Sequence, residues 1–242
     1  MRRSRVCAAL HRVEMAIDGT VQMLPLPRHS PNDLFSTDFE PHLNLPGFFP
    51  GAGGFFHGFQ GPTKRFMFFG TDFGPLNYQR GLDATGGELA TVATIQNLRG
   101  IAERAGVPLN ECFLTNAVLC MRRGDSAMDK FPVWNRYPDY VATCARWHRS
   151  VISDVKPDVV VLMGLPHLEF GPALFPELAS HWVGMKTLAD VFNASKETLR
   201  LPSGPLILLM YHPSMWNSHH KPFKERIIEH LSVAARRVCE NG

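Results

Sequence analysis

DVVVLMG, at residues 158–164, decides the fold of this chain, because its apolar residues run without interruption from an acidic residue to a glycine. A short apolar run without alternation is typical of a β-strand buried on both faces of a parallel sheet. Three further runs share this pattern: RFMFFG at 65–70, CFLTNAVL at 112–119 and PLILLMYH at 205–212. Together they predict a central, mainly parallel sheet of four strands.

Helical patterns fill the segments between and after these strands. They cover roughly residues 87–105, 137–155, 168–189 with breaks, and 224–238. Strands that alternate with helices imply βαβ units with right-handed crossovers, whose helices cover both faces of the sheet. We therefore expect an α/β fold with three layers, α/β/α.

The first 60 residues have a different composition. The stretches LPLPRHSPND at 24–33 and LPGFFPGAGGFFHGF at 45–59 are rich in Pro, Gly and Phe and show no helical or alternating period. The composition predicts a loop-rich N-terminal lead over residues 1–60 and one domain over residues 61–242. Packing of the aromatic side chains of the lead against the domain is its expected role.

The bulk composition limits the class of protein. A chain of 242 residues with 45% hydrophobic content can bury a full core, and a formal net charge of +3 permits contact with a polyanion. The five cysteines are scattered without a CxxC pair, which argues against a disulfide framework and for a reducing compartment. Because no apolar run suits a secretory signal or a membrane span, we expect a soluble, cytoplasmic protein.

Polar sequence follows three of the four predicted strands. The segments are GTDFGP at 70–75, TNAVLCMRRGD at 115–125 and YHPSMWNSHH at 211–220. Binding residues of an open parallel sheet lie in the loops just after the carboxyl ends of its strands. These three segments are therefore the candidates for a functional site, while GLPH at 164–167, after the remaining strand, is less informative.

Three motifs resemble those of the uracil-DNA glycosylase superfamily. GTDFGPLNYQRG at 70–81 is similar to its first motif, FLTNAVLCMRRGD at 113–125 to its uracil-reading segment, and HPSMWN at 212–217 to its second catalytic motif. Their order and their positions after apolar strands match as well, over about residues 65–231. The resemblance implies a DNA repair enzyme of base excision repair with this fold, which hydrolyses the N-glycosidic bond of uracil, or of a related deaminated base, flipped out of DNA.

The resemblance assigns catalytic roles to Asp72 and His212. A carboxylate at Asp72 stabilises the positive charge that develops on the sugar and orients a water, although an Asp before Gly-Pro also suits a simple turn. A neutral imidazole at His212, aimed by Pro213, donates to uracil O2 as the base departs. The motifs offer no lysine placed for a Schiff base, so we expect a monofunctional enzyme that leaves an abasic site.

Three residues are the candidates for binding the base. Asn116 lies in an apolar strand, where its amide needs a partner: by resemblance the uracil edge, or otherwise an adjacent loop backbone. The family generally stacks an aromatic ring on the base, but Leu82 or Asp83 stands near that position here. The available aromatic residues are Phe73 and Tyr78, which we expect to bind substrate.

The segments after the second and fourth strands supply the expected contacts to DNA. By resemblance, Ser214 binds a phosphate, and Met215 and Trp216 form a wedge that fills the gap left by the flipped nucleotide. Polar and basic side chains nearby suit the backbone phosphates. The predicted DNA-binding residues are Ser214, Met215, Trp216, Asn217, Lys221 and Arg122.

No cofactor is expected. Cys120 and Cys144 resemble in placement two of the four cysteines that hold an iron–sulfur cluster in one branch of the superfamily, but the other pair is missing. His219 and His220 are adjacent and lack the ligand spacing of a zinc site. The expected partner is DNA that contains uracil or another deaminated base, and the expected state is a monomer.

Two other functions stay open at this point. A glycosylase-like protein that binds nucleic acid but excises bases poorly is consistent with the missing stacking Phe, since a fold does not guarantee activity. A hydrolase that acts on a free nucleoside is the second alternative. The commonest versions of that class are excluded, because the chain has neither a Gly-x-Ser-x-Gly elbow nor a Walker-type loop.

Overall fold

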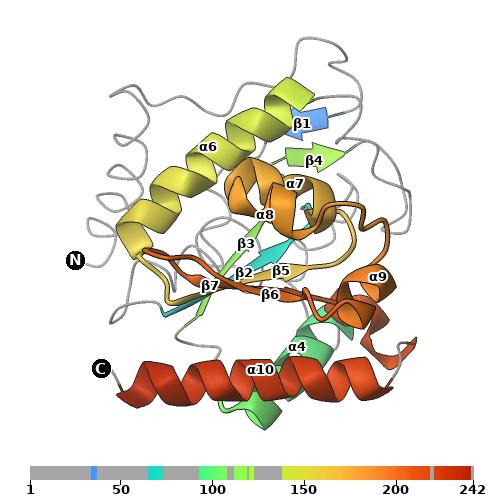
Figure 1. Cartoon of the computed structure of the whole chain (residues 1–242). Helices are drawn as coiled ribbons and strands as arrows, with labels where there is room; N and C mark the ends of the chain where they lie inside the picture. The colour runs from blue at the N-terminus through green and yellow to red at the C-terminus, as the bar shows by residue number, and fades with distance from the viewer. Residues whose placement is uncertain are drawn as a thin grey trace, which may run out of the picture.

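The centre of the molecule is a five-stranded sheet with the strand order β3-β2-β5-β7-β6 (Figure 1). The computed structural model describes residues 34–36, 65–72, 93–107, 112–118, 120–122, 138–218 and 221–240. The strands of the sheet are β2 (Phe66–Gly70), β3 (Cys112–Asn116), β5 (Val159–Met163), β6 (Thr198–Arg200) and β7 (Leu206–Met210). Strands β2, β3, β5 and β7 are parallel, and β6 is antiparallel to β7.

The four predicted strands are confirmed, but the predicted number of strands is wrong by one. The missed strand is β6, which has only three residues, Thr-Leu-Arg, none of them fully buried. It pairs with β7 through Leu199 and Ile207 at the edge of the sheet. A strand this short carries no apolar run or alternation long enough to be recognised in the sequence.

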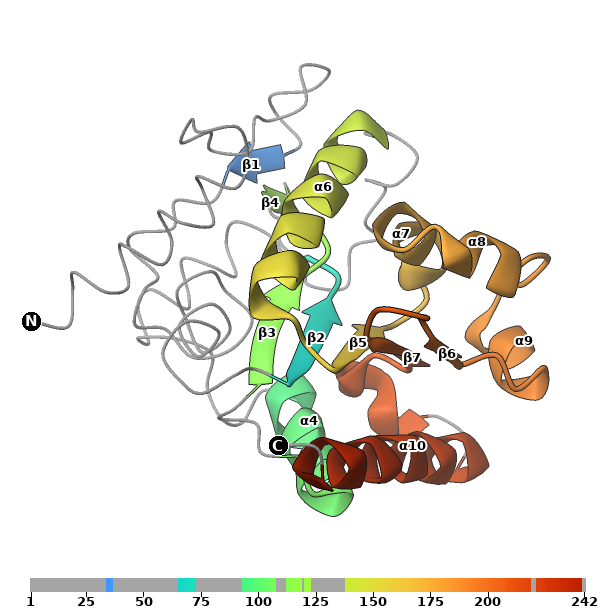
Figure 2. The same ribbon diagram turned by 60° about the vertical axis from the view of Figure 1, so that its left-hand side comes forward.

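Helices cover both faces of the sheet, which confirms the three-layer α/β/α fold. In Figures 1 and 2, α6, α7 and α8 lie on one face and α4 and α10 on the other. Their bounds are α4 (Ala93–Ala105), α6 (Pro138–Val155), α7 (His167–Leu174), α8 (Glu177–His181) and α10 (Lys221–Glu240). The predicted broken helical segment contains α7, α8 and the start of α9 (Leu188–Asn193), where Thr187 and Asp190 form a capping box.

The covering helices explain why the strands appear in the sequence as continuous apolar runs. Every residue of β2, β3 and β5 is buried. Across the sheet, Phe68 is in register with Val161, and Val161 with Leu208. Side chains on both faces of these strands are therefore removed from water. Because neither face is exposed to solvent, polar residues are not favoured at alternate positions.

A second, two-stranded sheet joins a short segment of the predicted N-terminal lead to the segment after β3. Strand β1 (Leu34–Ser36) is antiparallel to β4 (Cys120–Arg122), with Phe35 opposite Met121. Neither strand was predicted separately, because each has only three residues. The rest of the predicted lead lies outside the described residues. Among the helices that the structure describes, none is long and apolar enough to cross a membrane.

The amino edge of the sheet carries an ordinary structural ion pair. Arg65 Nε donates to Asp158 Oδ2 at 2.5 Å, and Arg65 also donates to the carbonyl of Val238 in α10.

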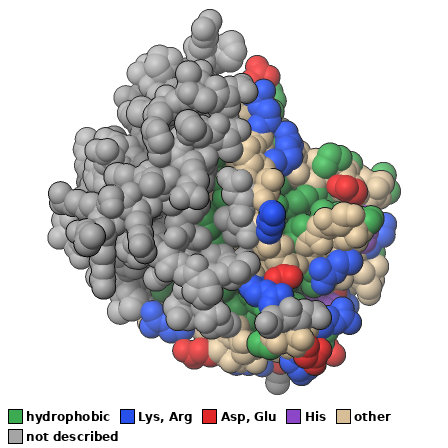
Figure 3. All heavy atoms as spheres, turned by 90° about the vertical axis from the view of Figure 1, so that its left-hand side faces the viewer, with side chains coloured by type: hydrophobic (Ala, Val, Ile, Leu, Met, Phe, Trp, Pro, Cys, Tyr) green, Lys and Arg blue, Asp and Glu red, His purple; other side chains and the backbone are tan. Residues whose placement is uncertain are grey.

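Figure 3 looks at the side of the molecule that is on the left in Figure 1, and positive and negative side chains are interspersed over the described part of that face. This mixture resembles a general solvated surface rather than a patch of one sign.

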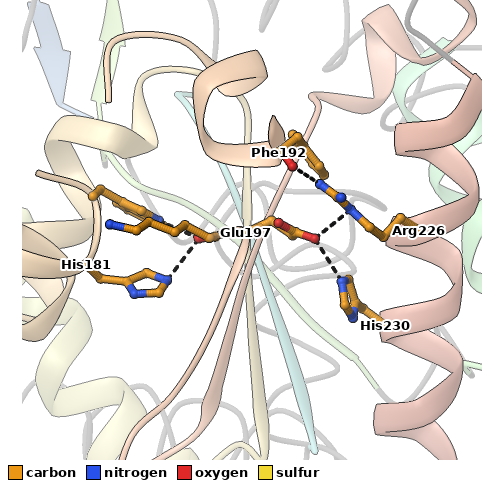
Figure 4. A network of polar contacts seen from close by, with 7 residues as sticks. His181, Phe192, Glu197, Arg226 and His230 are labelled. Carbon is orange, nitrogen blue, oxygen red and sulfur yellow. Dashed lines mark hydrogen bonds and ion pairs between the residues drawn. The ribbon is translucent and has the colours of Figure 1, made fainter. Parts of the chain in front are cut away.

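A polar network joins α10 to the segment between α9 and β6 (Figure 4). The side chain of Glu197 is 2% exposed, and its Oε1 lies 2.7 Å from Arg226 Nε and 3.0 Å from His230 Nε2. Arg226 also donates to the carbonyl of Phe192, whose ring stacks on Tyr211 with a centroid distance of 5.1 Å. Because Tyr211 follows β7 directly, the network supports the strand that leads to the HPSMWN segment.

Candidate active site

The strand order places a topological switch point at the carboxyl edge of the sheet, between β2 and β5, and a crevice is expected there. The chain leaves β2 toward α4 on one face and leaves the adjacent β5 toward α7 on the other face. Loops that diverge in this way open a crevice, where ligands bind in open α/β sheets. Asp72 follows β2, and His212 follows β7, two strands away, so about 10 Å separates these strand ends.

Gly164 lies between them, at the end of β5. Its N–H donates to the carbonyl of Met210 at 2.8 Å, which extends the pairing of β5 and β7 by one residue. Its φ is +104°, and a Cβ added there would lie 3.3 Å from the Cβ of His212. A glycine is therefore needed for the backbone conformation and for the close approach to His212, and it keeps the middle of the crevice free of a side chain.

Asp72 and Asn116 stand on neighbouring strand ends. Gly70 is in register with Asn116, and the pairing continues beyond the strands, since Ala117 N donates to Gly70 O at 2.9 Å and Val118 N to the carbonyl of Thr71 at 3.1 Å. Asn116 is 3% exposed, whereas Asp72 is partly buried. These backbone bonds fix the two side chains, one a carboxylate and one an amide, on the same edge of the crevice.

The imidazole of His212 is held in one tautomer. Ser214 N donates to His212 Nδ1 at 3.3 Å, and Ser214 Oγ lies 2.7 Å from the same nitrogen. A backbone N–H can only donate, so Nδ1 is the acceptor, and in a neutral ring the proton is then on Nε2. Burial lowers the pKa of His212 to about 4. At neutral pH the ring is therefore uncharged and presents Nε2–H as a donor.

The segment after His212 forms the 3-10 helix η2 (Pro213–Ser218) and is fixed from several sides. Asn97 Nδ2, in α4, donates to the carbonyl of Pro213 at 2.7 Å, and Met215 N donates to the carbonyl of His212 at 3.0 Å. Trp216 is 7% exposed and belongs to the core, with Lys224 Nζ 6.0 Å from its ring centroid. Met215, by contrast, is 44% exposed.

Two histidines lie buried beneath this edge of the sheet. His148 in α6 has its ring centroid 4.8 Å from that of Phe69, and both His148 and His167 in α7 contact the ring of Phe170. Burial, opposed by the facing carbonyls of Asn116 and Ala117, lowers the pKa of His148 to about 3. The four ring nitrogens meet no described group in hydrogen-bond geometry, so those carbonyls act electrostatically.

His167 is also close enough to His212 to interact with it. Burial, and to a smaller extent repulsion by His212, lowers the pKa of His167 to about 3, while the carbonyls of Gly70 and Phe69 oppose the shift. Both buried histidines are therefore neutral near pH 7. They line the underside of the strand ends that carry Asp72 and Asn116.

The structure describes the other predicted site residues to different extents. Ser214 is exposed and touches His212, as described above. Phe73 and Tyr78, the predicted aromatic contacts, lie outside the described residues, as do Leu82 and Asp83. The backbone is described, without the side chains, at Arg122, Asn217 and Lys221.

Several residues of this edge were not singled out in the sequence. Gly164 and His167 belong to GLPH, which follows a strand like the other motifs and was identifiable by that position alone. Asn97 and His148 lie in helices, and the contact of Asn97 with Pro213 spans 116 residues of sequence. The local sequence of a helix does not indicate which distant residues it will contact, so no sequence signal identifies these two residues.

No metal centre is formed by the described residues. Within the ranges given above, no group of three or more His, Cys, Asp and Glu side chains is arranged to hold a metal ion. Cys144 in α6 is fully buried and forms no disulfide. The described part of Cys120 is its backbone, in β4.

The chain matches the sequence profile of a known protein family over most of its length. The sequence profile of the uracil DNA glycosylase superfamily matches residues 57–232. The match includes all five strands of the central sheet and most of α10. Among curated proteins, none matches the chain.

Proposed function

The chain belongs to the uracil DNA glycosylase superfamily, and we propose that it is a monofunctional DNA glycosylase. In this proposal it hydrolyses the N-glycosidic bond of uracil, or of a related deaminated base, flipped out of DNA. The observation that carries the proposal is the state of His212, a neutral imidazole with Nδ1 engaged by Ser214 and Nε2–H available at the crevice. Such a ring donates a hydrogen bond without first having to lose or gain a proton.

His212 would stabilise the leaving base. As the glycosidic bond breaks, its electron pair moves onto the base and negative charge develops on the base oxygens. A donor that is already oriented stabilises that charge without reorganisation. The hydrogen bond from Ser214 N holds the ring in position, and the lowered pKa keeps the ring neutral over the physiological range.

Asp72 would act on the sugar, across the crevice from His212. The sugar gains positive charge at C1′ as the base departs, and a carboxylate beside it stabilises that charge. The carboxylate also orients a water whose oxygen bonds to C1′, while one proton of that water is taken up by Asp72 or by solvent. The products are the free base, protonated on nitrogen, and an abasic site. Separation of the two strand ends by about 10 Å leaves space for a nucleoside between the two side chains.

Asn116 would read the edge of the base. Its amide can accept from uracil N3–H and donate to O4, a pattern that cytosine does not match. A side chain that is 3% exposed and held on a paired strand end has little freedom to reverse its amide. We therefore propose Asn116 as the residue that selects uracil over cytosine, with Phe73 and Tyr78 as the proposed aromatic contacts.

Contacts to the DNA would come from η2 and its surroundings. Ser214 is exposed beside His212, where its hydroxyl can also reach a phosphate, and Met215 projects from the same turn. We retain Asn217, Lys221 and Arg122 as proposed phosphate contacts. Because Trp216 is packed in the core, its proposed role is to support the turn, and Met215 takes the role of the wedge.

The test is excision from end-labelled oligonucleotides with one uracil, single-stranded and in duplexes opposite G or A. After alkali treatment, the proposal predicts one strand break at the uracil and none in matched oligonucleotides that contain thymine or cytosine. Free deoxyuridine should stay intact, since a nucleoside hydrolase is the alternative that its cleavage would support. Intact uracil DNA, together with tight binding of that DNA, would instead support a binding protein without efficient excision.

A further inference from the structure

Three large apolar side chains are strongly exposed in the described part of the chain. They are Leu165, Met215 and Val183, which are 48%, 44% and 68% exposed. A single exposed apolar residue is normal on a protein surface and needs no explanation. Here, however, Leu165 and Met215 lie in the segments after the neighbouring strands β5 and β7, at the carboxyl edge of the sheet.

The backbone that carries Leu165 is rigid. Gly164, before it, is bonded to Met210 and would bring a Cβ to 3.3 Å from the Cβ of His212. After it, Leu168 N donates to the carbonyl of Leu165 at 3.0 Å, and His167 is fully buried. The side chain of Leu165 is therefore about half exposed to solvent from a fixed position just after the carboxyl end of β5.

Met215 projects from an equally fixed turn. Its N–H donates to the carbonyl of His212 at 3.0 Å, and the next residue, Trp216, is anchored in the core. Two exposed apolar side chains thus come from two hydrogen-bonded segments that follow neighbouring strands at the same edge of the sheet. Rigid, exposed apolar groups lose little conformational entropy when a partner covers them, which favours binding.

The proposed reaction supplies a partner with matching apolar surface. A nucleotide that is flipped out of a duplex leaves an open step, in which the faces of the adjacent bases are unstacked at a cost of a few kcal/mol. Apolar side chains that enter such a step offset that cost. Single-stranded DNA has no such step to fill, so the same side chains would matter much less there.

We propose that Leu165 is a DNA-contacting residue that pairs with Met215 to fill the duplex step vacated by the flipped nucleotide. The inference rests on the proposed function and adds a residue from the loop after β5, with a specific consequence. The pair should make excision from duplex DNA efficient while leaving excision from single-stranded DNA unchanged.

The test uses Leu165→Ala, Met215→Ala, the double variant and, as a control, Val183→Ala. Val183 is the third exposed apolar residue and follows α8 rather than a strand of the central sheet. With uracil opposite G in a duplex, we expect kcat/KM to fall about tenfold for each single variant, which corresponds to partial burial of one such side chain. On single-stranded substrate Leu165→Ala should match wild type, as should Val183→Ala on both substrates.

A second readout does not depend on catalysis. Binding to a duplex with a tetrahydrofuran abasic analogue should weaken about tenfold for Leu165→Ala, while binding to the single strand stays the same. Unchanged duplex excision and binding in Leu165→Ala would overturn the inference, and so would an equal loss on both substrates, which would indicate a general effect on the site. If wild type excises nothing, the proposed function fails, whereas the binding measurement still decides the role of Leu165.

Discussion

Two polar clusters of this protein each contain a histidine and a carboxylate, but their construction differs. In the Glu197 cluster, the carboxylate is buried and lies between Arg226 and His230 within 3.0 Å of both. At the carboxyl edge, Asp72 and His212 come from strands separated by β5, with Gly164 between them. In the first arrangement the histidine and the carboxylate contact each other, and in the second they come from strand ends two strands apart.

The comparison of the two clusters indicates which charged groups of this fold are candidates for binding a ligand. Internally paired groups stabilise a structure and have little capacity left for a ligand. Groups that come from separate strand ends, as Asp72 and His212 do, are the ones for which we propose a role in the reaction. A lowered pKa does not make the distinction, because burial also lowers the pKa of His148, which lies among aromatic rings.

The largest expected effect is on catalysis at the crevice. Asp72→Asn and His212→Ala should each lower kcat for uracil excision by roughly 10²- to 10³-fold, since each removes stabilisation of charge that develops in the transition state. The Tm of both variants should stay near that of wild type. Single-turnover excision and calorimetry on the same samples measure the two quantities, and a large fall in Tm with retained excision would reverse the assignment of these residues.

The next effect is on stability at the Glu197 network. Glu197→Ala should lower the free energy of unfolding by about 2–3 kcal/mol, less than the roughly 3–5 kcal/mol of a fully buried pair, because Arg226 and His230 remain 31% and 32% exposed. Urea unfolding gives this value. Excision measured well below the unfolding transition should be within about threefold of wild type. A selective loss of excision in a stable variant would contradict the structural role of the network.

The pH dependence of stability tests the structural role of the Glu197 network in a second way. Burial pushes the pKa of Glu197 upward, but the hydrogen bonds from His230 and its own backbone and the charge of Arg226 outweigh burial and leave the pKa below its ordinary value of 4.5. The stabilisation from this carboxylate is therefore complete above pH 4.5 and is lost as the pH falls through the folded pKa. The stability difference between wild type and Glu197→Gln should shrink over that acid range, and a constant difference would contradict it.

A smaller effect is expected for two glycine-to-alanine variants, which together distinguish steric crowding of His212 from backbone strain. Gly164 and Gly106 both have positive φ, at +104° and +69°, but an added Cβ would contact His212 only at Gly164 and would meet open space at Gly106. Replacement of either glycine by alanine should cost about 1–2 kcal/mol of stability. Excision should fall about tenfold for Gly164→Ala alone, because His212 must shift. Equal activities of the two variants would show that this close approach is unimportant.

The smallest effect concerns the tautomer of His212. Ser214→Ala removes the hydroxyl that lies 2.7 Å from Nδ1 but keeps the backbone N–H that donates to it. Excision should therefore fall by only about fivefold, the value of one neutral hydrogen bond. Nitrogen NMR of the ring should still report Nε2–H as the protonated nitrogen. A switch to Nδ1–H would mean that the hydroxyl, rather than the backbone, sets the tautomer.

The layers and the strand ends were predictable from the sequence, because a strand that is buried on both faces consists of a continuous apolar run. Continuous apolar runs such as 158–164 follow from two covering layers, and the polar residues after them follow from the crevice rule. The short strands were missed, since three residues such as Thr198–Arg200 carry no readable period. Local chemistry was predictable where a single segment contains it, as in HPSMWN.

The parts that depend on packing between distant segments were not predictable. Nothing in the local sequence shows that Trp216 lies in the core while Met215 is exposed, or that Asn97 holds Pro213. The same holds for His148 and His167, which come together under the strand ends only after α6 and α7 pack on one face. The choice of base and the contribution of Phe73 and Tyr78 remain predictions of the resemblance.

The most direct test of this account measures free uracil released from a single-stranded, uracil-containing oligonucleotide by wild type, Asp72→Asn and Glu197→Gln at pH 7. The account predicts release by wild type and by Glu197→Gln at similar rates, and a loss of roughly 10²-fold or more in Asp72→Asn with its Tm unchanged. Release that survives in Asp72→Asn but disappears in a folded Glu197→Gln would place the chemistry in the wrong cluster and contradict the account.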